Sequence, residues 1–353
     1  MCAAATSGPV TRSMSSGKNS RKIITKGSSK GTGGRGGKGN KVRCTGRRIP
    51  IGEDDRLREK IQRLKERLNA VILAHNYQRP EVQDIADFTG DSLELSRKAA
   101  GTGAGVIVFC GVRFMAETAA ILCPDKIVLL PDAAAGCRMA DMISAESLRH
   151  RKSELPGVPV VCYVNSSAEV KAESDICCAS ANALKVVESI KSNEVLFIPD
   201  RYLGANIAKQ TRKKIHLWPG FCPTHARIQP QDIIASRQKN PHAKVIVHPE
   251  CRPEVTALAD EVLSTGGMCR FARNTNATEV IVATETGIIH RLRKENPGKT
   301  FIPVSQKALC PNMKLVTLEK VLRSLEDMAL RISIPGDIAS NARRSIKAML
   351  DIK

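Results

Sequence analysis

Ala70-Val-Ile-Leu-Ala-His75 decides the fold, because the same pattern returns twice further along the chain. An apolar run closed by an aromatic or imidazole side chain is found again as Pro159-Val-Val-Cys-Tyr163 and as Lys244-Val-Ile-Val-His248. The three closing residues stand 88 and then 85 residues apart. A repeat period of this length predicts three copies of one structural unit.

Three further segments recur with the same period. In the second set a hydroxyl follows a short apolar stretch, and its members are Ala86-Asp-Phe-Thr-Gly-Asp-Ser92, Ser174-Asp-Ile-Cys-Cys-Ala-Ser180 and Ala259-Asp-Glu-Val-Leu-Ser-Thr265. The third set is apolar and comprises Gly105-Val-Ile-Val-Phe109, Glu194-Val-Leu-Phe-Ile198 and Glu279-Val-Ile-Val-Ala283. The fourth set ends in proline and comprises Lys126-Ile-Val-Leu-Leu-Pro131, Lys214-Ile-His-Leu-Trp-Pro219 and Lys299-Thr-Phe-Ile-Pro303. Within a few residues of each fourth segment comes a cysteine: Cys137, Cys222 or Cys310.

These apolar runs are rich in β-branched residues and lie between turn residues, which is typical of parallel strands buried on both faces. Parallel strands need right-handed crossover connections, so each copy should form a small α/β/α sandwich with a parallel sheet. Ligands bind at the carboxyl ends of such strands. The sequence therefore predicts an α/β protein of three pseudo-threefold-related sandwich units, with the active site at their centre.

The predicted units divide most of the chain. We expect repeats at residues 55–140, 141–225 and 226–312, followed by C-terminal helices at 313–353 that pack on the body. An amphipathic helix should begin at Asp54 or Asp55, since one stripe of its surface carries Leu57, Ile61, Leu64 and Leu68.

Residues 1–54 are predicted to form a disordered basic extension. Residues 1–50 hold 12 of the 55 Lys and Arg residues and no Asp or Glu, which leaves 43 basic against 35 acidic residues, or +8, for the rest of the chain. The extension is rich in Gly, Ser and Lys and has no apolar periodicity. A solvated tail, a nucleic-acid-binding arm and an organelle transit peptide all fit this composition.

No run approaches the roughly 18 apolar residues that a membrane span needs, so no membrane association is expected. The chain has 12 cysteines and no recognisable secretory signal, which indicates a reducing compartment. We therefore expect a cytoplasmic protein, with organelle targeting by the extension as the alternative.

The three post-strand cysteines are the strongest candidates for metal ligands. A single cysteine is usually a small buried hydrophobe, but three at equivalent positions favour ligation. No Cys-x-x-Cys occurs, which argues against a zinc ribbon or a thioredoxin-like site, and Cys222-Pro-Thr-His225 resembles half a zinc finger without a second half. Three thiolates are one short of the four that usually hold a 4Fe-4S cluster. One iron would then be open to substrate and act as a Lewis acid.

The polar residues near the predicted centre suit a small anionic substrate that bears a carbonyl group. Tyr163 and Asn165 can hold carboxylate or carbonyl oxygens. The polar side chains near the centre that can donate, accept or transfer protons are His75, Tyr77, His248 and Glu250.

Three hydroxyls each precede a predicted helix and form candidate anion seats. They belong to Ser92, Ser180 and Thr265. A hydroxyl beside the free backbone N–H groups of a helix start can bind an anion, and Thr265-Gly-Gly267 is best suited to phosphate. The alternative for each of them is a plain N-cap.

At these residues the chain resembles the quinolinate synthase family. The similarity covers roughly residues 56–350, and its motifs occur in the family's order. They are Ala74-His-Asn-Tyr-Gln78, Pro80-Glu-Val-Gln-Asp-Ile-Ala-Asp87, Gly90-Asp-Ser92, Tyr163-Val-Asn165, Ser180-Ala-Asn182, Cys222-Pro-Thr-His225, His248-Pro-Glu250, Ser264-Thr265 and Cys310-Pro-Asn-Met-Lys314.

The resemblance implies a transferase of de novo NAD biosynthesis. Such an enzyme condenses iminoaspartate (iminosuccinate) with dihydroxyacetone phosphate to quinolinate, phosphate and two waters. The resemblance also implies a partner enzyme that supplies the imine, either L-aspartate oxidase or aspartate dehydrogenase. An aconitase-like iron-sulfur hydro-lyase is the alternative, because it would share the cysteines and the open iron. A nucleic-acid-binding module is a further alternative. Only the basic extension favours it, because the rest of the chain contains no nucleic-acid-binding motif.

The resemblance also assigns individual residues. The family's cluster ligands match Cys137, Cys222 and Cys310. The family's substrate contacts match His75, Ser92, Tyr163, Val164, Asn165, Ser180, His248, Pro249, Glu250 and Thr265. Tyr77 matches a tyrosine that assists isomerisation and ring closure, and we expect Glu250 with His248, and Tyr77 with His75, to move protons. Some members carry a Cys-x-x-Cys-x-x-Cys run around the third ligand; it is absent here, so no redox disulfide is expected there.

Overall fold

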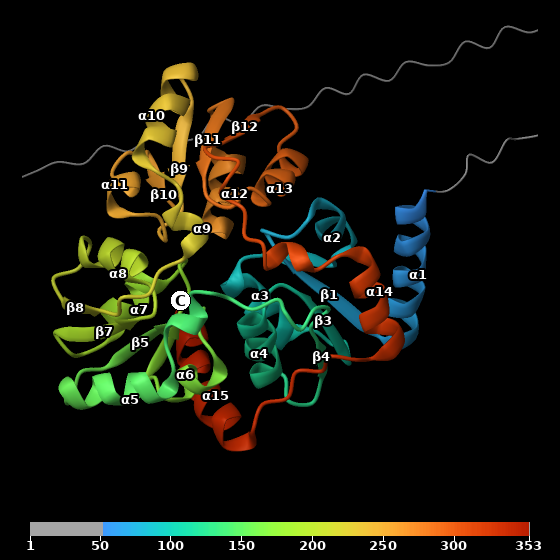
Figure 1. Cartoon of the computed structure of the whole chain (residues 1–353), viewed down its shortest axis with the longest axis horizontal. Coiled ribbons are helices and arrows are strands. Elements are labelled where there is room, and N and C mark those ends of the chain that lie inside the picture. The colour runs from blue at the N-terminus through green and yellow to red at the C-terminus, as the bar shows by residue number, and fades with distance from the viewer. Residues whose placement is uncertain (1–51, 353) are drawn as a thin grey trace, which may run out of the picture. The chain divides into compact units, whose positions relative to one another are not determined.

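The computed structural model describes residues 52–352, and the predicted extension lies almost entirely outside them. The described chain contains three four-stranded sheets (Figure 1). The first comprises β1 (Ala70–His75), β2 (Phe88–Gly90), β3 (Val106–Cys110) and β4 (Ile127–Leu129). The second comprises β5 (Val160–Tyr163), β6 (Ile176–Cys178), β7 (Glu194–Ile198) and β8 (Lys214–Leu217). The third comprises β9 (Lys244–Val247), β10 (Glu261–Val262), β11 (Glu279–Ala283) and β12 (Thr300–Pro303).

All three sheets have the same strand order: the second strand of the unit, then the first, the third and the fourth. Every pairing between neighbouring strands in them is parallel. Each sheet falls within one of the predicted repeat ranges. The predicted α/β fold of three similar units is confirmed.

Helices cover the sheets and make the crossovers between parallel strands. The first unit contains α1 (Glu53–Leu68), α2 (Pro80–Ile85), α3 (Ser92–Gly101) and α4 (Arg113–Leu122). The second contains α5 (Ala145–Glu154), α6 (Ala168–Ala172), α7 (Ala183–Ser189), α8 (Arg201–Ala208) and α9 (Pro223–Ala226). The third contains α10 (Pro230–Lys239), α11 (Pro253–Thr256), α12 (Thr265–Asn274) and α13 (Ile288–Glu295). Short 3₁₀ turns occur at Ala140–Met142 and Met313–Leu315.

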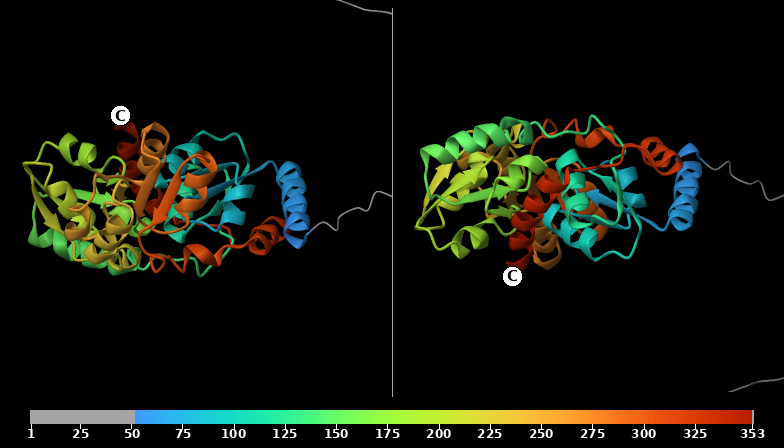
Figure 2. Two further views of the ribbon diagram at one scale, coloured as in Figure 1. Left: turned by 90° about the horizontal axis from the view of Figure 1, so that it is seen from above. Right: turned by 90° about the horizontal axis from the view of Figure 1, so that it is seen from below.

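The two C-terminal helices pack on different units. In α14 (Leu318–Asp327), Val321 belongs to the same apolar cluster as Ile61 of α1, and both views of Figure 2 show these helices side by side. In α15 (Gly336–Asp351), Ile346 joins the core of the second unit, against α6 and β6. Helices α1 and α14 therefore cover one face of the first sheet together.

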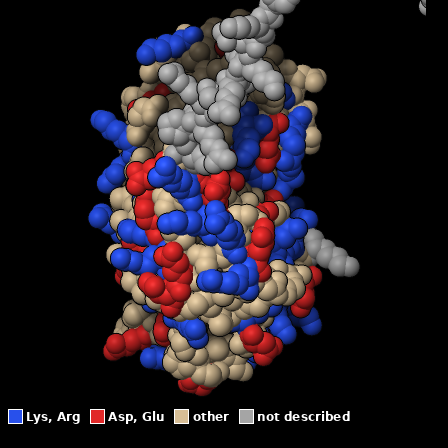
Figure 3. Space-filling model, turned by 90° about the vertical axis from the view of Figure 1, so that its right-hand side faces the viewer, with Lys and Arg blue, Asp and Glu red and all other residues tan. Residues whose placement is uncertain are grey.

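Helix α1 begins at Glu53, earlier than expected and within the range predicted for the extension. Its first turn contains Glu53, Asp54 and Asp55, and carboxylates are favourable at the positive end of the helix dipole. Ile61 and Leu64 are buried on the predicted stripe. The face in Figure 3, which includes this helix, shows basic and acidic side chains interleaved.

A repeated aspartate fastens the second strand of each unit to the first. The side chain of Asp175 accepts a hydrogen bond from the Val160 N–H at 2.7 Å, and the Asp175 N–H returns one to the Val160 carbonyl. Asp87 does the same with Ile72, and Asp260 with Val245. All three pairs are separated by 15 residues in sequence. The repeat therefore extends from the sequence pattern to individual hydrogen bonds.

Replacing Asp175 by alanine should destabilise the protein by about 1–2 kcal/mol, because the buried Val160 N–H loses its acceptor. The free energy of unfolding in urea measures this loss. Asp175→Asn keeps an acceptor oxygen, so its free energy of unfolding should fall clearly less than that of the alanine variant. Equal stability of the alanine variant and the parent protein would show that the strand does not need the side-chain acceptor.

No helix among residues 52–352 is long and apolar enough to cross a membrane.

Candidate functional site

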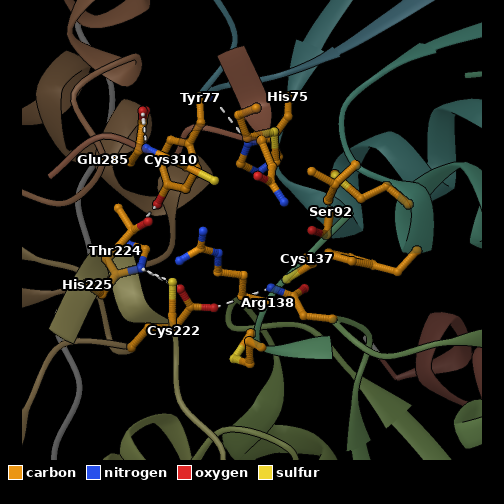
Figure 4. A pocket seen from close by; sticks show the side chains of 18 of the residues that line it. His75, Tyr77, Ser92, Cys137, Arg138, Cys222, Thr224, His225, Glu285 and Cys310 are labelled. Atoms are coloured by element: carbon orange, nitrogen blue, oxygen red, sulfur yellow. Dashed lines mark hydrogen bonds and ion pairs between the residues drawn. The ribbon is translucent and has the colours of Figure 1, made fainter. Parts of the chain in front are cut away.

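A central cavity lies where the three units meet (Figure 4). Its lining includes residues at or just beyond the end of the first strand of each unit. These are His75 and Tyr77 at β1, Tyr163 and Asn165 at β5, and His248 and Glu250 at β9. The carboxyl ends of the three central strands therefore supply equivalent walls. This arrangement is the one that the rule for parallel sheets predicts.

The cavity brings together twelve of the fourteen predicted site residues. These are His75, Tyr77, Ser92, Cys137, Tyr163, Asn165, Ser180, Cys222, His248, Glu250, Thr265 and Cys310. Val164 and Pro249 are buried beside it and do not line it. The Val164 N–H donates to the Cys178 carbonyl, and the Pro249 carbonyl accepts from the Asn206 side chain.

Exposure separates three cysteines from the others. Among the ten cysteines in the described residues, only Cys137, Cys222 and Cys310 are partly exposed, and all three line the cavity. The other seven are buried in the units, as expected for cysteines that act as small apolar side chains. Figure 4 shows the three cavity cysteines on different sides of one space.

The surroundings of these three sulfurs suit metal-bound thiolates. Burial raises the pKa of Cys137 to about 12 and raises the pKa of the Cys222 and Cys310 thiols, so each needs a cation to ionise. Against this effect, backbone N–H groups two or three residues further along the chain point at each sulfur and lower its pKa. They belong to Met139 and Ala140 for Cys137, to His225 for Cys222, and to Asn312 and Met313 for Cys310.

Those N–H groups are available because a short helical turn follows each cysteine: Ala140–Met142, α9 or Met313–Leu315. N–H donors to the sulfurs are one of the means by which proteins tune iron-sulfur clusters. The donor set in this cavity therefore fits an iron-sulfur cluster held by three cysteines.

Two of the three histidines that line the cavity, His75 and His248, each accept a backbone N–H at ring Nδ1. The Tyr77 N–H donates to His75 Nδ1 at 3.1 Å, and the Glu250 N–H donates to His248 Nδ1 at 3.3 Å. Burial lowers the pKa of both histidines to about 3, so both are neutral at pH 7. Because Nδ1 accepts in each ring, the proton of the neutral ring sits on Nε2. Both rings can therefore donate a hydrogen bond from Nε2.

Glu250 is the buried negative charge of the site. Burial alone would raise its pKa, but His225, through its electrostatic interaction and a ring hydrogen bond, lowers it to about 2, with smaller contributions from His248 and Tyr163. His225 Nδ1 lies 2.7 Å from one Glu250 oxygen, and Asn165 Nδ2 donates to the other at 3.3 Å. Glu250 is therefore ionised at neutral pH and is held by residues of the second unit.

A chain of hydrogen bonds connects Tyr77 to Glu250. The Tyr77 hydroxyl lies 2.5 Å from Thr284 Oγ1, and Thr284 Oγ1 lies 2.8 Å from His225 Nε2. His225 Nδ1 then donates to Glu250, because a carboxylate only accepts. The Thr284 hydroxyl lies between the phenol and His225 Nε2, so it can accept from one and donate to the other. Protons can move along this chain between the phenol and the carboxylate.

The alternative of plain N-caps is wrong for all three hydroxyl residues. Asp91 caps α3 and Ser264 caps α12, each by accepting a backbone N–H of the first turn. Ser92 and Thr265 are the first helical residues, and both line the cavity. Ser180 precedes the α7 cap, Asn182, by two residues. The neighbouring residues satisfy the helix starts, so the hydroxyls of Ser92 and Thr265 are not needed as caps.

Sequence reasoning missed His225, Thr284, Glu285 and Asp200 as site residues. Glu285 lies two residues after β11 and accepts the Cys310 N–H at 3.1 Å, while Asp200 lies two residues after β7 and accepts the N–H groups of Tyr202 and Leu203. Asp200 is fully buried, and burial is the main cause that raises its pKa well above the usual range. Applying the strand-end rule to the third strand of each unit, as well as to the first, would have found Asp200, Thr284 and Glu285.

One group of three side chains in the described residues could also hold a single metal ion. It consists of Cys222, His225 and Glu250, whose ligand atoms lie within 4.8 Å of one another. Only Cys222 is shared with the three cysteines. The repeat relates the three cysteines to one another but does not relate the members of this mixed group. Two of these members, His225 and Glu250, belong to the hydrogen-bonded chain described above.

Comparisons with known proteins agree with this site. The family model described as Quinolinate synthetase A protein matches residues 59–351. A quinolinate synthase of Dehalococcoides mccartyi is 63% identical over 293 residues, which cover 83% of this chain and 97% of that protein. A quinolinate synthase of Methanoregula boonei is 57% identical over 294 residues, again 83% of this chain and 97% of the relative. A quinolinate synthase of a Geobacter species is 56% identical over 289 residues, or 82% of this chain and 95% of the relative.

The match covers all three units, so it includes every strand end and cysteine that meets in the cavity. This chain belongs to the quinolinate synthase family of NAD-biosynthetic enzymes.

Proposed function

We propose that the chain condenses iminoaspartate with dihydroxyacetone phosphate to give quinolinate, phosphate and two waters. Three equivalent cysteines, one from each unit, facing one cavity carry the proposal most strongly. Cys137, Cys222 and Cys310 would hold a 4Fe-4S cluster with one iron free of protein thiolate. When bound, this cluster supplies a Lewis-acidic iron.

The side chains of the cavity suit the dicarboxylate substrate. Neutral His75 and His248 offer Nε2–H donors to carboxylate oxygens, and the hydroxyls of Ser92 and Thr265 add two more. Asn165 Oδ1 is buried and has no hydrogen-bond partner among the described residues, which leaves it free to accept from a substrate N–H. Val164, Pro249 and Ser180 belong to the same proposed binding site, the first two as backbone neighbours.

The residues of the hydrogen-bonded chain suit the proton transfers of the reaction. Isomerisation, ring closure and the two dehydrations each need a proton to be removed at one atom and delivered at another. Glu250 is ionised and can accept one, and Tyr77 keeps its proton because burial, its main perturbation, raises its pKa well above the usual range. His225 and Thr284 connect the two, so a proton taken at one end can be replaced from the other.

The direct test is an assay of anaerobically purified protein. We expect a brown protein with about four irons per chain that forms quinolinate only when both substrates are supplied. An aconitase-like hydro-lyase would need no triose phosphate. Conversion of a hydroxy-diacid in the absence of dihydroxyacetone phosphate, without quinolinate formation, would favour that alternative.

Tyr77→Phe should lower turnover about a hundredfold while the KM values change little, because the ring still packs against His75 and only the hydroxyl of the chain is lost. Steady-state kinetics on the purified variant measure this. Tyr202→Phe is the matched control, since Tyr202 hydrogen-bonds to Arg201 outside the cavity. Unchanged turnover in Tyr77→Phe would remove Tyr77 from the proton transfers.

We place the reaction in the cytoplasm, as fits the bacterial and archaeal relatives, with L-aspartate oxidase or aspartate dehydrogenase as the source of the imine.

A further inference from the structure

We infer that Asn76 and Arg291, two residues outside the cavity lining, fix the Thr265 hydroxyl as a hydrogen-bond donor to a carboxylate of the dicarboxylate substrate. The inference rests on the proposed function, which places that substrate in the cavity. It names two positioning residues that act through Thr265.

Asn76 bridges the first and third units. It follows β1 directly, and its side chain is fully buried. Its Nδ2 donates to Thr265 Oγ1 at 2.9 Å, at the start of α12. Its Oδ1 accepts from Arg291 Nη1, in α13, at 2.7 Å. A single amide therefore touches the hydroxyl with one end and the guanidinium with the other.

The guanidinium determines which end of the amide faces which partner. All polar hydrogens of Arg291 are donors, so the amide atom that faces it must be the oxygen. The NH₂ group of Asn76 then faces Thr265, and the hydroxyl oxygen must accept from it. Turning the amide over would set two donors against each other at a fully buried position, which costs a hydrogen bond on both sides.

Arg291 is itself held in place. The same Nη1 atom also donates to the Thr89 carbonyl of β2 at 2.7 Å, and Nε donates to Glu295 at 2.6 Å. Its side chain is only 16% exposed. Thr89 of the first unit and Glu295 of the third unit thus hold the guanidinium in place. The Arg291 side chain is therefore not free to rotate away from the Asn76 amide.

The Thr265 proton is left for a ligand. One lone pair of the hydroxyl oxygen receives the Asn76 N–H, and no group of residues 52–352 accepts the hydroxyl proton. Thr265 is 2% exposed and lines the cavity. A hydroxyl that can rotate freely serves donors and acceptors alike, whereas a hydroxyl fixed as a donor favours a carboxylate over a neutral or cationic group.

Asn76→Asp tests the direction of this hydrogen bond. A carboxylate only accepts, so it keeps Arg291 as a partner and turns the Thr265 proton away from the cavity. We expect the KM for iminoaspartate to rise about tenfold or more, with the KM for dihydroxyacetone phosphate and the Tm nearly unchanged. A rise in the KM of the triose phosphate alone, or no change in either KM, would overturn the inference.

A double-mutant cycle separates the hydrogen bond from simple charge repulsion. Thr265→Val removes the hydroxyl, so adding Asn76→Asp to it should change the KM for iminoaspartate by less than about twofold. The same tenfold rise in both backgrounds would mean that the new charge repels the substrate directly, and the inference would fail. Quinolinate formation by the unmodified protein is measured first; its absence would overturn the proposed function instead.

Arg291→Met is the second variant, because it adds no charge near the substrate. It frees the Asn76 amide to turn over, so the KM for iminoaspartate should rise severalfold, and this rise should also disappear in the Thr265→Val background. A rise that persists without the hydroxyl would show that Arg291 acts only on the packing of the two units.

Discussion

Glu250→Gln is expected to lower turnover about a thousandfold while the substrates still bind, because the amide keeps the shape of the side chain and cannot take up a proton. In the parent protein the carboxylate is ionised, and it receives hydrogen bonds from His225, Tyr163 and Asn165. A glutamine can keep at most part of this set. Steady-state turnover, together with direct measurement of substrate binding by calorimetry, separates the two effects.

Glu194→Gln is a matched control for this experiment. Glu194 also lies 2.7 Å from a histidine, His216, but its pair is outside the cavity and is partly exposed. Its loss should leave turnover unchanged. Near-normal turnover in Glu250→Gln would make Glu250 a positioning residue, and the base would have to be His248 or Tyr77.

Cys137→Ala should remove the bound iron and all measurable activity, because a cluster with two protein thiolates is not held. Iron content and visible absorption of anaerobically purified protein measure the first effect, and quinolinate formation measures the second. The same outcome is expected for Cys222→Ala and Cys310→Ala, since the repeat makes the three positions equivalent.

Cys110→Ala provides the comparison, because Cys110 is buried in β3 and does not line the cavity. That variant should keep iron and colour, even if its stability falls. A full complement of iron in Cys137→Ala would contradict the assignment of the three ligands.

The fold could be predicted because its signal is local and threefold. Each strand is a short apolar run, and its copies at matching positions in the other units removed the ambiguity between a buried strand and a buried helix segment. The same alignment of the three copies identified the residues at the ends of the first strands and the cysteines after the fourth strands. Helix α1 begins slightly earlier than predicted because its acidic first turn, and not the apolar stripe, determines its start.

The polar connections of the site could not be predicted in this way. Thr284 touches Tyr77 across 207 residues of sequence, and no local pattern encodes such a contact. In the sequence His225 is part of the Cys222-Pro-Thr-His225 motif alone, whereas its hydrogen-bond partners Glu250 and Thr284 come from another unit. Which helix-start residue caps and which faces the cavity also depends on the packing of neighbouring units, as Asp91 and Ser92 illustrate.

The long sequence separations within the cavity have a consequence for the order of folding. Each sheet closes over a few tens of residues, whereas the contacts between Asn76 and Thr265 and between Tyr77 and Thr284 close loops of 189 and 207 residues. Closing such loops costs chain entropy before any contact repays it, so these contacts should form late. We therefore expect the three sheets to acquire hydrogen-exchange protection first, and the backbone amides around the cavity to gain it last during refolding.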